Sequence, residues 1–279
     1  MGKTALILPG GGTRGVIHGG ACLALEEMGI HFDLLVCASV GVCTGIFAST
    51  GQVRQSAHIW KNHIHGNQFI HWSARCIPHM NFRYLIHCLR DKAGLTLAHI
   101  GKHGELIVVL TDLQTGNPLY ITLSPQSELW RIVRASIAVP LLSQPIEIDG
   151  RMVCDGGAIE PIPLAYALKQ ECTDITVVHT YPRSWQPSDR LWRVLGTFLP
   201  PGSPATQAVM RQWAKRYRES CQLMENPPSG VRIRTIWAPE RPSMHFLSTN
   251  REILEAWFTH GYREAYRMHG QTAPPTLSF

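Results

Sequence analysis

The sequence predicts an α/β fold of three layers, in which helices cover both faces of a mainly parallel sheet. Short apolar stretches alternate along the chain with stretches in which apolar residues recur at helical spacing. Two of these apolar stretches run directly into small-residue turns that begin a helix, and no repeat or low-complexity linker interrupts the 279 residues. Because this alternation is typical of a parallel sheet buried between helices, we expect one domain over residues 1–279.

The first two units of the chain each consist of a strand and a helix. Residues 5–8 are apolar and predict a buried strand, the loop Gly10–Gly15 follows Pro9, and helical spacing extends from Val16 to Met28. Residues 34–37 predict the next buried strand. The residues Ala38-Ser39-Val40-Gly41 then lead into a helix of small residues over 42–49, so a strand again turns sharply into a helix.

The alternation continues less regularly in the rest of the chain. Periodicity predicts further helices at residues 53–62, 82–92, 127–136, 163–170, 206–224 and 250–268. Apolar runs predict further strands at residues 106–111, 119–123, 152–154, 175–180 and 231–237. We expect the catalytic motifs within residues 5–180, and a basic, aromatic, Pro-rich and helical region in residues 181–279.

The positive charge is concentrated in one segment. The chain has 26 Lys and Arg against 20 Asp and Glu, and residues 181–220 alone hold seven basic residues against two acids. The same segment contains Trp185, Trp192, Phe198, Leu199 and Trp213. Basic residues interleaved with aromatic ones suit an anionic membrane surface or a nucleic acid, and a solvated helix face is the alternative. We expect lipid as the partner and no nucleic acid.

Targeting and redox features predict a cytoplasmic protein, with peripheral membrane contact in addition. The first apolar run is only four residues long before Pro9, too short for the core of a signal peptide. The charge-free stretch 34–53 holds too many polar residues and glycines to span a bilayer. The eight cysteines include no CxxC pair, as expected of reduced thiols.

The loop Gly10–Gly15 fits two kinds of ligand. It matches G-x-G-x-x-G between a strand and a helix, as in a dinucleotide-binding oxidoreductase. However, Asp33 precedes the second strand, whereas the carboxylate that binds a ribose belongs at the end of that strand. Glycine amides at a helix N-terminus also stabilise negative charge, so the loop can hold an oxyanion instead.

Ser39 is the candidate nucleophile. A serine between a buried strand and a helix is typical of a nucleophile elbow, which needs small residues two positions before and after it. Gly41 meets this requirement, and Cys37 meets it only in part. A serine that caps the N-terminus of the helix is the alternative interpretation.

Asp155 is the candidate partner of Ser39. It follows the expected strand 152–154 and precedes Gly156 and Gly157. Because the carboxyl ends of parallel strands share one edge of a sheet, we expect Asp155 and Ser39 to meet there. A simple Asp-Gly-Gly turn is the alternative interpretation.

Taken together, these motifs resemble the patatin-like phospholipase family. The resemblance covers residues 5–180 and rests on the loop Gly10–Gly15, residues 38–41, residues 134–140 and Asp155-Gly156-Gly157 with Pro161 and Pro163. It implies a patatin-like fold and a Ser–Asp dyad, without histidine, that hydrolyses acyl esters of glycerolipids. No cofactor and no metal is implied.

The resemblance also implies a role for each matching residue. Ser39 becomes the nucleophile and Asp155 the base. The oxyanion hole is assigned to Gly10, Gly11, Gly12 and Arg14, and the elbow to Cys37 and Gly41. The chain departs from the family at Cys37, where the elbow has glycine, and at Pro9. Both departures bear on catalytic efficiency more than on the fold.

The expected function is that of a serine acyl-ester hydrolase of the phospholipase A or lysophospholipase type. Ser39 Oγ would attack a fatty-acyl ester of a membrane glycerolipid and form an acyl-enzyme, which water then hydrolyses. An aspartate with the usual pKa of about 3.9 is a weak base at neutral pH, so we expect an apolar site that raises the pKa of Asp155.

Four other hypotheses remain open at this point. A Ser39–Asp155–His triad would use His179 or His245. The protein could keep the fold but bind or regulate lipids with little catalysis, or it could be a nucleotide-binding oxidoreductase. A zinc site would draw on side chains whose spacings fit no standard template, namely His58, His63, His65, His71, His79, His87, Cys76 and Cys88.

Overall fold

The structure, a computed structural model, describes residues 2–72, 78–140, 142–197 and 204–275. The strands are β1 (Lys3–Leu8), β2 (Leu34–Ala38), β3 (Ile70–Trp72), β4 (Pro78–Met80), β5 (Glu105–Asp112), β6 (Pro118–Thr122), β7 (Ile146–Ile148), β8 (Arg151–Asp155), β9 (Cys172–Val178) and β10 (Arg232–Ile236). The helices are α1 (Val16–Glu27), α2 (Gly41–Thr50), α3 (Val53–Asn62), α4 (Phe82–His87), α5 (Leu129–Ser136), α6 (Leu164–Lys169), α7 (Asp189–Thr197), α8 (Pro204–Arg211), α9 (Trp213–Glu225) and α10 (Arg251–Met268). Short 3-10 helices lie at Gly12–Gly15, Leu97–His99 and Gly156–Ala158, and a π-helix at Cys88–Lys92 continues α4.

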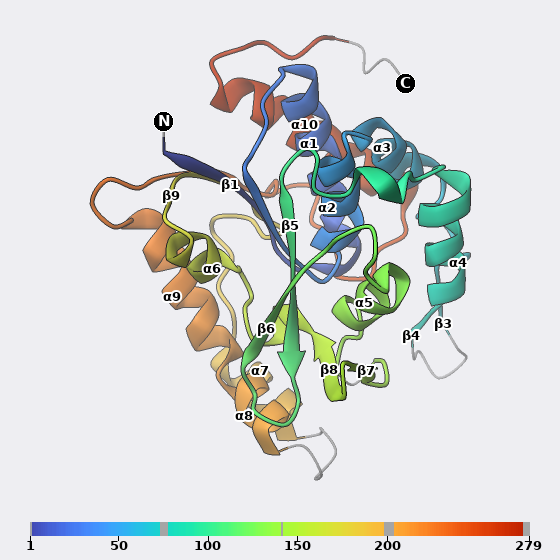
Figure 1. Ribbon diagram of the computed structural model, residues 1–279, viewed down its shortest axis with the longest axis vertical. Helices are drawn as coiled ribbons and strands as arrows, with labels where there is room; N and C mark the ends of the chain where they lie inside the picture. Colours follow the sequence, from blue (N-terminus) through green and yellow to red (C-terminus); the bar gives the residue numbers. More distant parts are fainter. Residues whose placement is uncertain (1, 73–77, 141, 198–203, 276–279) are drawn as a thin grey trace.

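The central sheet is mainly parallel. In the described part of the chain its strand order is β10-β9-β1-β2-β5-β8-β7, and β6 pairs with β5. Strands β10, β9, β1, β2 and β5 run parallel, whereas β6, β8 and β7 pair antiparallel with their neighbours. Figure 1 shows the helices packed around this sheet. The expected α/β class with a mainly parallel sheet is therefore confirmed.

Two hydrophobic cores lie on opposite faces of the sheet. On β1, Leu6 and Leu8 belong to a core shared with α1, α2, α3, α5 and α10, while Ala5 and Ile7 belong to a core shared with α6 and α9. Successive side chains of a strand point to opposite faces, so covering both faces requires a continuously apolar strand. This arrangement explains the apolar runs in the sequence and gives the three layers.

Several elements differ from the expectation. The helix expected over 206–224 is two helices, α8 and α9, which meet at Gln212. Strands β3, β4 and β7 and helix α7 are not predicted, because three-residue strands and a helix in a Pro-rich region show little periodicity. Phe198 and Leu199, two of the predicted membrane-facing residues, lie outside the described residues. Within those that are described, no helix has the length and apolarity needed to cross a bilayer.

Strand β8 brings Asp155 to the site from an unexpected direction. Ala38 is level with Val109 of β5, and Asp155 is level with the next residue, Leu110. Strand β8 runs antiparallel to β5. It begins beyond the carboxyl end of β5, at the lower end of β5 in Figure 1, and ends at Asp155. Asp155 therefore lies beside Ser39 as expected, but the parallel-strand reason for that expectation is wrong.

Candidate active site

Ser39 occupies the turn between β2 and α2. Its φ of 53° lies in the left-handed region, which is uncommon for a residue with a side chain and fits a nucleophile elbow. A Cβ atom on Gly41 would collide with the carbonyl oxygen of Leu8, so glycine lets α2 begin close to β1. The tight turn presents the hydroxyl of Ser39 at the carboxyl edge of the parallel strands.

The hydroxyl of Ser39 does not cap helix α2. The N-cap residue is Val40, and no side chain of the described residues caps this helix. Ser39 Oγ instead donates a hydrogen bond of 2.6 Å to Asp155 Oδ2. The interpretation of Ser39 as a helix cap is therefore wrong.

The thiol of Cys37 packs against α2, in the core that α1, α2 and α3 form on one face of the sheet. Cys37 is fully buried, and a Cβ atom on Gly45 would collide with Cys37 Sγ. Burial raises the pKa of this thiol well above its usual value. The elbow therefore tolerates a cysteine at position 37 because α2 carries a glycine at position 45.

Asp155 is held by its backbone and by both oxygens of its carboxylate. Its N–H donates to the carbonyl oxygen of Ala138 at 3.1 Å, and its own carbonyl oxygen accepts from Thr111 Oγ1 at 2.8 Å. Its Oδ2 accepts from Ser39 Oγ at 2.6 Å, and its Oδ1 accepts from the Gly157 N–H at 2.7 Å. The carboxylate is thus fixed in one orientation toward the serine.

Burial makes Asp155 a stronger base than an ordinary aspartate. The residue is only 4% exposed, and loss of hydration raises its pKa to about 7. The hydrogen bonds from Ser39 and Gly157 lower the pKa but do not outweigh the burial. A carboxylate with a pKa near neutrality is suited to accept a proton at physiological pH. The rise expected from the sequence is therefore present.

The loop Gly10–Gly15 lies against this pair. A Cβ atom on Gly10 would be 3.1 Å from Ser39 Cβ, and one on Gly12, whose φ is 58°, would collide with the carbonyl oxygen of Phe246. The same carbonyl accepts from the Thr13 N–H at 2.9 Å. Within the described residues, the N–H groups of Gly10, Gly11 and Gly12 donate to no backbone carbonyl. Three consecutive amides without a backbone acceptor therefore line the cavities that reach the serine.

Arg14 is placed differently from the glycines. Its N–H donates to the carbonyl oxygen of Gly11 at 3.3 Å, so this amide already has an acceptor. Its guanidinium lies 4.1 Å from the ring centre of Tyr181 and 5.7 Å from that of Phe246. These cation–π contacts attach the glycine loop to the segments after β9 and before α10.

Two cavities among the described residues reach Ser39. One, of about 610 Å³, is lined almost entirely by apolar side chains from α2, α3 and the segment 64–89. The other, of about 500 Å³, contains Asp155 and is lined by Tyr181, Trp192 and Trp213. Val139 and Phe246 line both cavities. The serine thus stands between an apolar and an aromatic compartment.

Histidine does not bridge the serine and the aspartate. His179 Nδ1 accepts from the Tyr181 N–H at 3.0 Å, and burial lowers the pKa of His179 to about 3. Within the described residues no hydrogen bond joins His179 or His245 to Ser39 or Asp155. The direct contact favours a dyad over the triad.

The residues considered for zinc and for a nucleotide ribose lie elsewhere. Over the described ranges, no three His, Cys, Asp or Glu side chains gather as a metal site, and Cys76 falls outside those ranges. Asp33 accepts hydrogen bonds from Thr4 N–H at 2.8 Å and Thr4 Oγ1 at 2.9 Å, at the amino ends of β1 and β2. This carboxylate is therefore at the opposite edge of the sheet from the glycine loop.

Comparison with known families agrees with this geometry. A sequence model described as patatin-like phospholipase matches residues 6–168, which is more than half of the chain. The chain belongs to the patatin-like phospholipase family. The predicted membership is confirmed, and the matched region contains the glycine loop, the elbow and Asp155.

Known relatives and a solved structure resemble this patatin-like chain at low to moderate sequence identity. An uncharacterized NTE family protein of Mycobacterium tuberculosis is 30% identical over 166 residues, which are 58% of this chain and 45% of that protein. Lysophospholipase NTE1 of Cryptococcus neoformans is 26% identical over 201 residues, 68% of this chain and 12% of that protein. The chain thus spans less than half the length of these relatives. VipD from Legionella pneumophila shares the fold, with a TM-score of 0.51 at 15% identity over 96% of this chain and 66% of that chain.

Some residues of this patatin-like site cannot be recognised from sequence motifs. Phe246 closes over the glycine loop, yet 233 residues separate it from its hydrogen-bonding partner Thr13. Trp213 Nε1 donates to the carbonyl oxygen of Gly157 at 2.7 Å and supports the turn after Asp155. The only sequence signal for Trp213 is its place in the basic aromatic segment, and Phe246 lies in a loop with no motif.

Proposed function

We propose that the protein is a serine acyl-ester hydrolase of the phospholipase A or lysophospholipase type. The observation that carries the proposal is the 2.6 Å hydrogen bond from Ser39 Oγ to Asp155, a buried carboxyl with a pKa of about 7. Family membership supports a lipid hydrolase in general. The relatives named Lysophospholipase NTE1 support the narrower class.

The first half of the proposed reaction transfers the acyl group to Ser39. Asp155 Oδ2 accepts the serine proton while Oγ attacks the ester carbonyl carbon, and the carbonyl oxygen becomes an oxyanion. The ester C–O bond then breaks, and the alcohol leaves with the proton from Asp155. In the second half, water gives a proton to Asp155 and attacks the acyl-enzyme, so that the fatty acid leaves and Ser39 recovers its proton.

The glycine loop supplies the proposed oxyanion hole. The N–H groups of Gly10, Gly11 and Gly12 have no backbone acceptor among the described residues, and these glycines line the cavities that reach Ser39. Gly10 keeps the loop within contact of the serine, and the Arg14 N–H holds the carbonyl of Gly11. Loss of one oxyanion donor typically lowers the rate by about 10²- to 10³-fold. We therefore assign this stabilisation to the amides of Gly10, Gly11 and Gly12.

The two cavities suit the two halves of a glycerolipid ester. The apolar cavity of about 610 Å³ begins at Ser39 and has almost no polar lining, as an acyl chain requires. The aromatic cavity of about 500 Å³ contains Asp155, which must return the proton to the leaving alcohol. We assign the acyl chain to the first cavity and the glycerol side to the second.

We also propose that the edge of the molecule around the site contacts an anionic membrane. Among the described residues, the exposed large apolar side chains are Leu142, Met152, Leu191 and Val194. They come from α7, β8 and the turn after α5, all at the lower end of the molecule in Figure 1. Arg190 and Arg193 of α7 are exposed beside Leu191 and Val194. The free thiols support action in the reducing cytoplasm.

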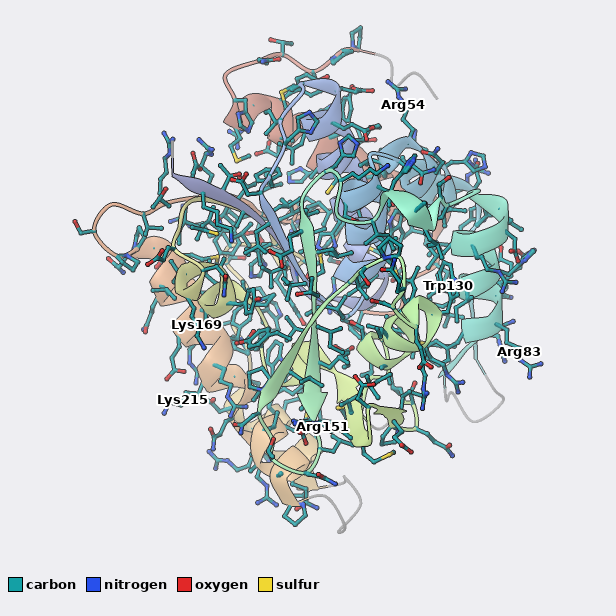
Figure 2. The ribbon with its side chains drawn as sticks, in the orientation of Figure 1. Arg54, Arg83, Trp130, Arg151, Lys169 and Lys215 are labelled. Atoms are coloured by element: carbon teal, nitrogen blue, oxygen red, sulfur yellow. The ribbon has the colours of Figure 1, made fainter. Side chains whose placement is uncertain are left out.

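Neutralising α7 is expected to weaken binding to vesicles. Arg190→Gln with Arg193→Gln should weaken binding to phosphatidylserine-containing vesicles, measured by sedimentation, by roughly 30-fold, since each of the two basic residues near such a surface contributes about 1 kcal/mol. The control is Arg54→Gln with Lys169→Gln, which also removes two positive charges. Figure 2 shows that Arg54 and Lys169 lie away from the lower end of the molecule, so sedimentation should be nearly unchanged. Equal losses in both double variants would contradict a specific membrane face.

A fluorophosphonate probe tests the proposed reaction directly. The protein is expected to be labelled at Ser39, and Ser39→Ala is expected to remove the label and the hydrolysis of lysophospholipid. Ser49→Ala is the matched control, because Ser49 is also buried but its Oγ donates to the carbonyl oxygen of Ile46 at 2.9 Å. Labelling of another residue would contradict the dyad. Folded protein without label or turnover would favour a lipid-binding protein instead.

A further inference from the structure

Ser56 is a buried hydroxyl inside the apolar cavity. It lies on α3, is 1% exposed, and is one of the few polar residues that line the cavity beside Ser39. Its Oγ has no hydrogen-bond partner among the described residues. Burying a hydroxyl without a partner costs free energy, so such a group needs an explanation.

The buried hydroxyls of Thr44, Ser49 and Thr50 on the adjoining helix α2 are paired. Ser49 Oγ and Thr50 Oγ1 donate to the carbonyl oxygen of Ile46 at 2.9 and 3.1 Å. Thr44 Oγ1 accepts from Trp60 Nε1 at 3.1 Å. Trp60 lines the same cavity as Ser56, yet its polar atom is satisfied within the protein. The hydroxyl of Ser56 is thus a buried polar group without a partner on the lining of this cavity.

We propose that Ser56 hydrogen-bonds an oxygen substituent on the acyl chain, which makes it a specificity residue for hydroxylated or otherwise oxygenated fatty acyl groups. This inference rests on the proposed function, which puts the acyl chain in this cavity. The apolar lining around Ser56 includes Ile59, Ile64 and Leu85. A hydroxyl on a bound chain would find few other polar partners on this lining, and an unsubstituted chain leaves Ser56 unpaired.

The asymmetry between the two chain types follows from the cost of unpaired polar groups. A site that hydrogen-bonds a substrate hydroxyl rejects the analogue without it, because the buried polar group of the site is then left without a partner. A single neutral hydrogen bond corresponds to roughly 3- to 10-fold in binding. The preference should also depend on where along the chain the hydroxyl stands, because Ser56 is fixed on α3.

The test compares esters of stearic acid with esters of its positional hydroxy isomers. For the wild type, kcat/KM is expected to be higher for one or two adjacent hydroxyl positions than for the unsubstituted chain. In Ser56→Ala this ratio should fall roughly 3- to 10-fold, while Ser49→Ala should leave it unchanged. A ratio that is independent of hydroxyl position, or that Ser56→Ala does not alter, would overturn the inference.

Binding to a catalytically inactive variant separates this inference from the proposed function. Calorimetry of free stearic acid and its hydroxy isomers is carried out on Ser39→Ala and on Ser39→Ala with Ser56→Ala. If no ester is hydrolysed but Ser56→Ala weakens only the binding of one hydroxy isomer, the proposed function fails and the subsite stands. If esters are hydrolysed and neither the binding nor the kcat/KM ratio changes, the subsite alone fails.

Discussion

Replacing Asp155 with asparagine is expected to lower kcat by roughly 10²- to 10⁴-fold and to make the protein more stable above pH 7. The amide can still accept a hydrogen bond from Ser39 Oγ, so the fold should remain, but it cannot take the serine proton. The gain in stability arises because the wild type must keep a carboxylate in a site where it is 4% exposed. Turnover and unfolding are measured on the same preparations.

The pH dependence of both quantities follows from the raised pKa of Asp155. Because this pKa moves from 3.8 to about 7 on folding, the folded state holds an extra proton between these values. The free energy of unfolding of the wild type therefore falls as pH rises from about 4 to 7, by up to about 4 kcal/mol. Over the upper part of this range kcat/KM rises, since only the ionised form acts as a base.

An exposed aspartate provides the control for this experiment. Asp149→Asn makes the same chemical change in an exposed turn and should retain both turnover and the pH dependence of the wild type. In Asp155→Asn, the fall in the free energy of unfolding between about pH 4 and pH 7 should disappear. Turnover retained in Asp155→Asn would exclude Asp155 as the base, and an unchanged pH slope would exclude it as the group that titrates near 7.

Replacing Gly41 with alanine is expected to reduce activity by about 10²-fold or more, because small misplacements of reacting groups have effects of this size. The added Cβ would collide with the carbonyl oxygen of Leu8, so α2 and the turn that carries Ser39 must move away from β1. Overpacking of this kind costs about 1–3 kcal/mol of stability. Ester hydrolysis and thermal unfolding are the measurements.

A glycine elsewhere separates the loss of activity from the loss of stability. Gly29 has a φ of 68° with open space around it, so Gly29→Ala is destabilised by backbone strain alone, by about 1–2 kcal/mol. This variant should keep its activity at temperatures where it is folded. If Gly41→Ala were equally active when folded, the close crossing of α2 and β1 would not position the nucleophile.

The parallel core and the two reacting residues could be predicted because each has a local signal. Strands β1, β2, β5 and β9 are covered on both faces, and this leaves uninterrupted apolar runs in the sequence. Ser39 stands in a sharp strand-to-helix turn that needs the glycine at position 41. Asp155 is marked by the two glycines that follow it. Short-range sterics dictate these features, so they are visible in short-range patterns.

The direction of β8 and the closure of the site depend on contacts that are distant in the sequence. A three-residue apolar stretch does not reveal whether it joins a sheet parallel or antiparallel, and β8 joins β5 antiparallel. Phe246 reaches the glycine loop from just before α10, and the apolar cavity is completed by side chains from the segment 64–89. No periodicity within these segments indicates which distant residues they meet.

The contact between Cys37 and Gly45 limits the order in which these two positions can change during evolution. The sulfur fills the space in which a side chain at position 45 would have to sit. A side chain at position 45 is therefore accommodated once position 37 has lost its sulfur, by becoming alanine or glycine, whereas the reverse order passes through a clashing intermediate. The two sites are coupled in the sense that the effect of one substitution is set by the other. Among descendants of this sequence, we therefore expect substitution at position 37 to precede substitution at position 45.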